Sequence, residues 1–215
     1  MSSPSEATSL EPVRVHLGCG RSIREGWINV DRITGPGVDV VADLDDLRRT
    51  PLPFEDDSVD ELHASHLLEH VRDPLALMQE LHRVAKPGAT AVFNVPYGTS
   101  DDAFTDPTHA RPYFVDSFSY FAQPTYWRAD YGYRGDWQPG YVVLAVDKAR
   151  YANVPDDDVR ADIRHLRNVV HEMTAVLVCV KPVRPQEREL MQHPEIEILR
   201  VDPSAAGQPG LPGDA

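Results

Sequence analysis

The sequence predicts an α/β sandwich built around a mainly parallel sheet. Short apolar segments of strand length alternate with helical patterns or tight connections through the first half of the chain. The chain has 215 residues and 41% hydrophobic residues, which is enough for one domain with a substantial core. No internal repeat is visible, so a single domain is the simplest interpretation.

Seven segments have the alternating or continuous apolar pattern that is typical of strands. The last of them contains the apolar run TAVLVCV, which has the length of a buried strand and falls far short of the ~20 residues that span a membrane. In chain order the expected strands are Val13–Leu17, Trp27–Val30, Val38–Ala42, Val59–Ala64, Ala89–Val95, Tyr141–Val146 and Thr174–Val180.

The clearest helix lies in the segment DPLALMQELHRVAKPG, before the fifth strand. Asp73 is suited to cap it, Pro74 fits its first turn, and the Pro-Gly pair at 87–88 stops it. Its apolar stripe recurs at steps of three and four residues and consists of Leu75, Met78, Leu81 and Ala85. The charged segment DDDVRADIRHLRN, between the last two strands, predicts a second, shorter helix.

Composition restricts the partners and the compartment. The formal net charge of -13 disfavours nucleic acid and anionic membranes, which both attract basic surfaces. Two cysteines, Cys19 and Cys179, cannot form a disulfide framework, and free thiols suit a reducing compartment. Because the first residues also lack the pattern of a signal peptide, we expect a cytoplasmic protein. Within it we expect a flexible segment at 1–12, one domain at 13–183, and a largely disordered, Pro- and Gly-rich tail at 184–215.

The motif LGCG follows the first strand, where ligands of parallel sheets bind. Gly18 and Gly20 allow the backbone to approach a ligand closely. A dinucleotide-binding turn would have a third glycine where Ile23 stands, and the short gap before the second strand leaves no room for a helix of ~10–14 residues. A nicotinamide-dependent oxidoreductase is therefore disfavoured. Asp31, at the end of the second strand, offers two acceptor oxygens for ribose hydroxyls, although a simple capped turn explains the same residues.

Five motifs in series resemble those of the class I S-adenosylmethionine-dependent methyltransferases, in particular the small methyltransferase type 11-like proteins. They are VHLGCG, INVDR, ADLDDL, LPFEDDSVDELHASHLLEHV and LHRVAKPGATAVFNVP, within residues 13–96. The chain departs from most of the family in its abbreviated first crossover, GRSIREGWINVD, and is similar in this to a subset of predicted methyltransferases. The resemblance implies a Rossmann-like, doubly wound fold with S-adenosyl-L-methionine as its cofactor. We expect its seven-stranded, mainly parallel sheet to have an antiparallel last strand.

By position in these motifs, the resemblance implies contacts along the whole cofactor. The contacts are Gly18, Cys19 and Gly20 at the methionine part, Asp31 and Arg32 at the ribose, Asp43 and Leu44 at the adenine, and Ser65 and His66 beside the sulfonium and its methyl group. Cys19 is expected to line the cofactor rather than to act as a nucleophile. A cofactor without phosphates does not need a helix N-terminus, which agrees with the short first crossover.

The loop that follows the fifth strand, residues 97–121, reaches the same edge of the sheet. Methyl transfer to an alcohol, phenol or ammonium requires a group that takes a proton, and histidine is the usual one. We take His109 as the first candidate base, with Asp106 orienting it and Arg111 reaching an anionic part of the acceptor. His66 is a further catalytic candidate. The alternative is that these polar residues only pin the loop to the sheet.

Two further segments carry weaker signals. The stretch HASHLLEH has an H-x-x-E-H spacing at His66, Glu69 and His70, and some RNA-end methyltransferases bind a divalent cation through a similar E-x-x-E-H. Three residues in one stretch do not define a metal site, so we assign none and leave the question open. The segment PTYWRADYGYRGDWQPGY interleaves aromatic residues and arginines. It is suited to stack an acceptor or single-stranded nucleic acid, or to cover the sheet or a dimer surface.

The sequence therefore predicts an enzyme, a methyltransferase that transfers a methyl group from S-adenosylmethionine to O or N of a small molecule. A secondary metabolite or a sugar is the expected acceptor class, covered by residues 97–140. The alternatives are a methyltransferase acting on a peptide, protein or nucleic acid, and a non-catalytic cofactor-binding subunit that requires a partner chain. The sequence is also compatible with a homodimer.

Overall fold

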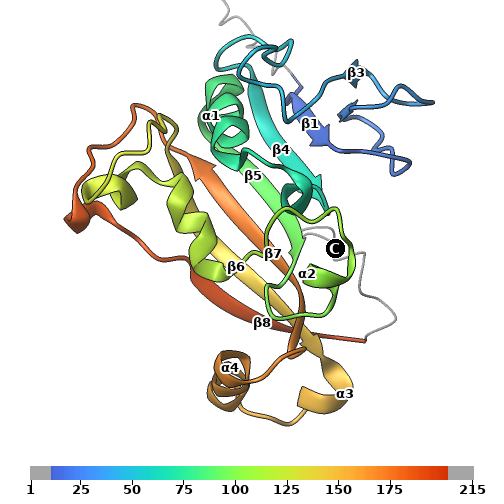
Figure 1. Cartoon of the computed structure of the whole chain (residues 1–215), viewed down its shortest axis with the longest axis vertical. Coiled ribbons are helices and arrows are strands. Elements are labelled where there is room, and N and C mark those ends of the chain that lie inside the picture. Colours follow the sequence, from blue (N-terminus) through green and yellow to red (C-terminus); the bar gives the residue numbers. More distant parts are fainter. Residues whose placement is uncertain (1–10, 203–215) are drawn as a thin grey trace, which may run out of the picture.

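A computed structural model describes residues 11–202 of the chain (Figure 1). Its strands are β1 (Arg14–Leu17), β2 (Ile28–Asp31), β3 (Val40–Val41), β4 (Val59–Ser65), β5 (Ala85–Pro96), β6 (Trp137–Asp147), β7 (Val170–Cys179) and β8 (Glu195–Val201). They form one sheet in the order β3-β2-β1-β4-β5-β7-β6-β8. The first five strands are parallel, and β7 runs antiparallel to both β5 and β6. The expected fold class, a mainly parallel sheet with an antiparallel strand, is confirmed.

The sheet has one strand more than the seven that were expected. The additional strand, β8, pairs in parallel with β6 and lies at the edge of the sheet, inside the segment expected to be a disordered tail. It is held there because Ile198 is buried and because Arg200 donates hydrogen bonds to the carbonyls of Tyr151 and Val154, both at 2.8 Å. The Pro and Gly that predict disorder fall mainly after this strand, and residues 203–215 lie outside the described residues, as do residues 1–10 of the expected flexible start.

The connection between β1 and β2 contains no helix, as its length predicts. Instead, the backbone N–H of Cys19 donates to the carbonyl of Val30 at 3.1 Å, which ties the glycine turn directly to β2. Gly18 has a φ of +63°, and a Cβ at this position would lie 2.8 Å from Cδ1 of Leu67. The turn therefore requires glycine here for its backbone conformation and for its packing.

The main helix, α1 (Pro74–Val84), begins as its sequence indicates but ends earlier, because Ala85 and the Pro-Gly pair at 87–88 belong to β5. The Asp73 side chain accepts a hydrogen bond from the N–H of Ala76 at 3.0 Å, and the chain passes directly into β5 after Val84. The other helices are α2 (Asp102–Thr105), α3 (Lys148–Tyr151) and α4 (Asp156–His165), and the 3-10 turns are η1 (Leu68–His70), η2 (Val115–Phe121), η3 (Gln123–Trp127) and η4 (Arg188–Leu190). No helix within residues 11–202 is long and apolar enough to cross a membrane.

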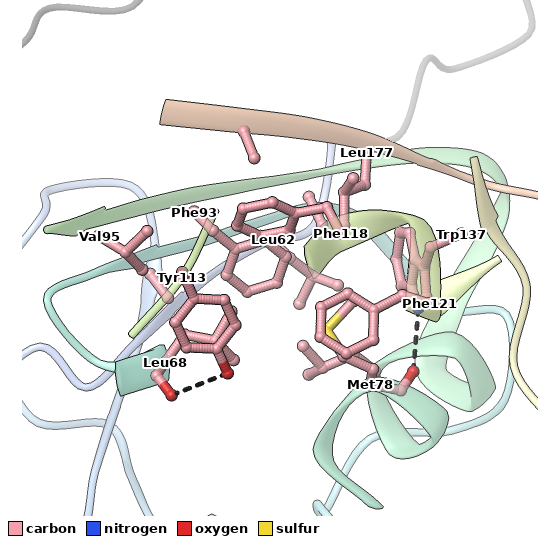
Figure 2. Packing of buried hydrophobic residues seen from close by; sticks show 14 of the residues in the cluster. Leu62, Leu68, Met78, Phe93, Val95, Tyr113, Phe118, Phe121, Trp137 and Leu177 are labelled. Atoms are coloured by element: carbon pink, nitrogen blue, oxygen red, sulfur yellow. Dashed lines mark hydrogen bonds between the residues drawn. The ribbon is translucent and has the colours of Figure 1, made fainter. Parts of the chain in front are cut away.

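The core fixes the position of the loop that follows β5 (Figure 2). The ring of Phe118, from η2, is fully buried against the sheet. The hydroxyl of Tyr113 donates to the carbonyl of Leu68 at 3.3 Å, and the indole N–H of Trp137 donates to the carbonyl of Met78 at 2.9 Å. Both polar groups are thus satisfied within the apolar cluster: Tyr113 holds the loop against η1, and Trp137 holds the start of β6 against α1.

Candidate functional site

The carboxyl ends of β1, β2 and β3 contribute to one cavity of about 760 Å³, called here the strand-end cavity. Gly18 follows β1, Asp31 ends β2, and Asp43 lies two residues beyond β3. The loop after β5 completes the wall with residues 107–110. The volume is in the range of small-molecule sites, ~300–1,000 Å³.

The structure brings five of the nine expected cofactor contacts into this cavity. They are Gly18, Asp31, Arg32, Asp43 and Leu44. Gly20 lines a neighbouring hollow of about 620 Å³, which shares Asp31 with the strand-end cavity. Cys19 is buried, and Ser65 and His66 are not among the residues that line the cavity. The ribose and adenine contacts therefore lie together, while those expected at the sulfonium lie apart from them.

Asp31 holds the glycine turn and keeps capacity for a ligand. Its Oδ2 accepts the N–H of Gly20 at 2.8 Å, and its Oδ1 accepts the N–H of Ile33 at 2.9 Å. Each carboxylate oxygen has two lone pairs, so one acceptor position remains on each. Two positions on one oriented carboxylate fit the two hydroxyls of a ribose. The hydrogen bonds of Asp31 are therefore compatible with a capped turn and also with the binding of a ribose.

The thiol of Cys19 has the character of a lining group. Burial, followed by the nearby carboxylate of Asp31, raises its pKa above the ordinary value. A raised pKa keeps the thiol protonated at neutral pH, and a protonated thiol is a poor nucleophile. This agrees with the expectation that Cys19 is not a nucleophile.

His66 lies between two carboxylates. Its Nε2 is 3.1 Å from Oε1 of Glu172, and its Nδ1 is 3.4 Å from Oε1 of Glu69. The contact with the carboxylate of Glu172, followed by that with Glu69, raises the pKa of His66 to about 10. A histidine that is protonated at neutral pH has no lone pair with which to accept a proton, so the structure favours a structural ion pair over a base at His66. Sequence analysis missed Glu172, because only the pairing of β7 with β5 brings it to this place.

Asp106 orients His70, and its carboxylate makes no hydrogen bond to His109. Its Oδ1 accepts the N–H and the hydroxyl of Thr108, at 2.8 and 2.7 Å. The hydroxyl oxygen of Thr108 lies 2.9 Å from Nδ1 of His70. Because the Thr108 proton is directed to Asp106, Nδ1 of His70 is the donor in this contact. The contact between Asp106 and His109 is through the backbone, with the N–H of His109 donating to the Asp106 carbonyl at 3.2 Å.

His109 lines the cavity beside His70. Its Nδ1 lies 3.1 Å from the carbonyl of Ala103, which can only accept, so Nδ1 carries the proton and Nε2 keeps a lone pair. The two imidazole rings meet edge to face with centroids 4.7 Å apart. The N–H of Ala110 donates to the carbonyl of Glu69 at 2.7 Å, which fixes the loop to η1. As a result, Glu69, His70 and His109 each offer one ligand atom within 4.8 Å of the others.

Arg111 is turned away from the strand-end cavity. Its guanidinium donates to the carbonyl of Arg72 at 2.8 Å and lines a separate hollow of about 500 Å³. The aromatic segment is divided between this hollow and the core: Tyr126 and Tyr131 line the hollow, and Tyr133 and Trp137 are buried. The structure thus separates Arg111 and His66 from the cavity that His109 lines.

Comparisons with known proteins find similarity to methyltransferases within the first half of the chain. Residues 16–93 match the model of the methyltransferase domain. A protein of Mycobacterium sp. strain KMS, named as an uncharacterized methyltransferase, is 41% identical over 61 residues, 26% of this chain and 24% of that protein. A methyltransferase of Mycolicibacterium vanbaalenii is 49% identical over 45 residues, 21% of this chain and 18% of that protein. The matches therefore span about a quarter of these relatives or less.

Solved structures share the fold over most of the chain. An S-adenosylmethionine-dependent methyltransferase from Archaeoglobus fulgidus has a TM-score of 0.52 at 17% identity, covering 78% of this chain and 86% of that one. A Haloferax volcanii methyltransferase, solved in complex with the activator Trm112, has a TM-score of 0.50 at 18% identity, covering 82% and 86%. Residues 16–93 are therefore similar to a methyltransferase domain, and the fold is that of the solved S-adenosylmethionine-dependent methyltransferase.

Proposed function

We propose that the chain is an S-adenosylmethionine-dependent methyltransferase that transfers a methyl group to O or N of a small molecule bound in the strand-end cavity. The observation that supports this most is the composition of that cavity. It is lined by the glycine turn and by carboxylates from the ends of two neighbouring strands, and also by two imidazoles, His70 and His109. Groups suited to hold a nucleoside and groups suited to handle a proton therefore share one small-molecule-sized space.

The residues of the chain contribute positioning and proton transfer. S-adenosylmethionine supplies an electrophilic methyl group when it is bound. Asp31 would accept hydrogen bonds from the ribose, and Asp43 and Leu44, which line the same cavity, are the residues proposed for the adenine. Because methyl transfer is an in-line displacement, fixing the two reactants in one cavity supplies much of the rate. The free Nε2 of His109 is placed to take the proton that an alcohol or ammonium acceptor loses.

A second candidate is a methyltransferase that is active only with a partner chain. The Haloferax volcanii protein, which shares the fold, was solved in complex with a methyltransferase activator. The matched part of the curated relatives is also about a quarter of their length or less, so functions of their other parts have no counterpart in the match. Activity that appears only on addition of a second protein would favour this candidate.

The test is calorimetric titration of the purified chain with S-adenosylmethionine and S-adenosylhomocysteine. We expect Asp31→Ala to weaken binding by about 10- to 150-fold, equal to the ~1.5–3 kcal/mol of lost charge-assisted hydrogen bonds. Asp157→Ala, on the exposed face of α4, is the matched control and should bind as the unmodified chain does. Unchanged affinity in a folded Asp31→Ala variant, or no binding of either nucleoside at millimolar concentration, would contradict the proposal.

A further inference from the structure

Three side chains from two segments converge beside the strand-end cavity, which His70 and His109 line. Glu69 and His70 come from η1, and His109 comes from the loop after β5. One carboxylate oxygen and one nitrogen from each imidazole lie within 4.8 Å of one another. Ligand atoms around an ion with bonds of ~2.1 Å lie about 3–3.5 Å apart, so small side-chain rotations bring all three into a coordination sphere.

Both imidazoles are held in the tautomer that a metal requires. Nδ1 of His109 donates to the carbonyl of Ala103, and Nδ1 of His70 donates to the hydroxyl of Thr108, which in turn donates to Asp106. Each ring therefore keeps its lone pair on Nε2. Histidines that bind metals commonly donate the other ring N–H to a carbonyl or to a group bound to a carboxylate, which fixes the orientation of the ring.

The carboxylate of Glu69 lacks the hydrogen bonds that a buried carboxylate needs. Glu69 is 2% exposed, and neither of its side-chain oxygens accepts a hydrogen bond from a described residue. Nδ1 of His66 lies 3.4 Å from Oε1 of Glu69, and the other nitrogen of the same imidazole contacts Glu172. A buried carboxylate without hydrogen bonds is costly, and a cation on its other oxygen removes that cost.

The formal charges around the cluster also suit a divalent cation. Three carboxylates, those of Glu69, Glu172 and Asp106, lie in the cluster or contact its neighbours His66 and Thr108. Two imidazoles and one carboxylate form the ligand set of divalent transition metals with open coordination positions, and they differ from the all-oxygen sets of Mg²⁺ and Ca²⁺.

We propose that Glu69, His70 and His109 bind one divalent transition-metal ion beside the strand-end cavity, with Thr108 and Asp106 positioning His70. The H-x-x-E-H spacing pointed to His66 as the third ligand; the geometry replaces it with His109, which lies far along the sequence. Resting on the proposed function, this site narrows the acceptor to a compound with a hydroxyl group. An oxygen of that group would complete the coordination, and a bound metal lowers the pKa of such a hydroxyl, the role otherwise left to His109 as a base.

The test is titration of the untagged, chelator-treated full chain with Co²⁺, followed by visible absorption and calorimetry. We expect one Co²⁺ per chain. His109→Ala and Glu69→Gln should weaken binding by at least ~100-fold, and Thr108→Val, which only removes the hydroxyl that orients His70, by ~10–100-fold. His165→Ala removes an exposed histidine on α4 and serves as the matched control, with unchanged affinity.

Two results would overturn the metal site. One is the absence of Co²⁺ absorption at millimolar metal, and the other is an affinity that the His109 and Thr108 variants leave unchanged. Circular dichroism of each variant separates loss of the site from loss of the fold, and the Thr108→Val change on the exposed loop keeps the test valid if the buried Glu69→Gln variant does not fold.

The same preparations distinguish this inference from the proposed function. Co²⁺ binding is measured without any nucleoside, and S-adenosylhomocysteine is then titrated into the metal-free chain. Metal binding without nucleoside binding would retain the metal site and reject the methyltransferase. Nucleoside binding without metal binding would retain the methyltransferase and reject the metal site. His109 would then remain the candidate base.

Discussion

Two histidines at the end of β4, three residues apart, lie in opposite electrostatic environments. His63 is buried next to Arg24, whose guanidinium nitrogen is 3.0 Å from its Nε2, and next to the ring of His16. Burial, followed by the charge of Arg24, lowers the pKa of His63 to about 3. His66 is paired with two carboxylates, which raise its pKa to about 10. The first histidine is therefore neutral and the second charged at neutral pH.

The neutral state of His63 predicts acid sensitivity of the fold. In the unfolded chain His63 takes up a proton near pH 6.5, whereas in the folded chain it does so only near pH 3. Between these values the unfolded state binds more protons, so the free energy of unfolding falls as the pH is lowered. We expect His63→Gln to make this slope shallower by up to ~1.4 kcal/mol per pH unit. Urea unfolding of both proteins between pH 7 and pH 4 provides the measurement.

Other groups contribute to the same slope, so the difference between the two proteins is the informative quantity. Burial also lowers the pKa of His16 and of His82, which adds acid sensitivity to both chains. Parallel slopes for the unmodified chain and the His63→Gln variant would show that His63 is not held neutral by the fold.

At the scale of elements, the cap of α1 can be tested separately from its ion pair. The Asp73 side chain accepts the N–H of Ala76 at 3.0 Å and also pairs with Arg48 at 2.8 Å. We expect Asp73→Ala to lower the free energy of unfolding by ~1 kcal/mol, because an orphan N–H is exposed at the helix start. Asp73→Asn keeps the cap and loses the exposed ion pair, so it should lower the free energy of unfolding by only a few tenths of ~1 kcal/mol.

Chemical denaturation of the two Asp73 variants distinguishes the contributions. Equal losses in both would assign the stabilising effect to Arg48 and leave the cap without measurable weight.

The elements that the sequence predicts best are those with a complete local signal. The helix from Pro74 has a capping residue, an apolar stripe and a stop, and the structure confirms its existence and start. The glycine turn and the carboxylate at Asp31 were predicted from strand ends, and they lie in one cavity. Local chemistry and strand order are sufficient for such features, because the carboxyl ends of parallel strands meet at one edge.

The features that the sequence does not predict depend on pairs distant in the chain. Glu172 reaches His66 only because β7 inserts between β5 and β6. Asp106 was expected to orient His109, but its carboxylate binds Thr108 instead, since a two-residue spacing favours this local turn. No spacing rule predicts that His109 lies against His70, 39 positions earlier in the chain.

At the scale of the whole molecule, the sheet ends in a strand, β8, that lies in a segment whose composition predicts disorder. β8 covers β6, which would otherwise be the edge of the sheet, and it is tied to α3 and α4 through Arg200 and Arg160. Apolar side chains of β8 alternate with charged ones, which is the pattern of a strand with one buried face. The strand is therefore part of the domain rather than of a tail.

Removing β8 should destabilise the whole domain. We expect a chain that ends at His193 to have an unfolding midpoint lower by roughly 5 °C or more, because burial of Ile198 and the pairing with β6 are lost. A chain that ends at Asp202 separates this effect from loss of the residues that follow β8. Coincident melting curves for the chain that ends at His193 and the full chain, recorded by circular dichroism, would show that β8 contributes nothing to stability.

The hydrogen bond from the N–H of Ala110 to the carbonyl of Glu69 affects how a ligand enters the strand-end cavity. Together with the contact between Thr108 and His70, it fastens the loop to the turn that carries two of the three proposed metal ligands. An outward movement of this loop would separate the imidazoles of His70 and His109 and disrupt the cavity wall before a ligand binds. We therefore expect a ligand to enter the strand-end cavity while this loop stays in place.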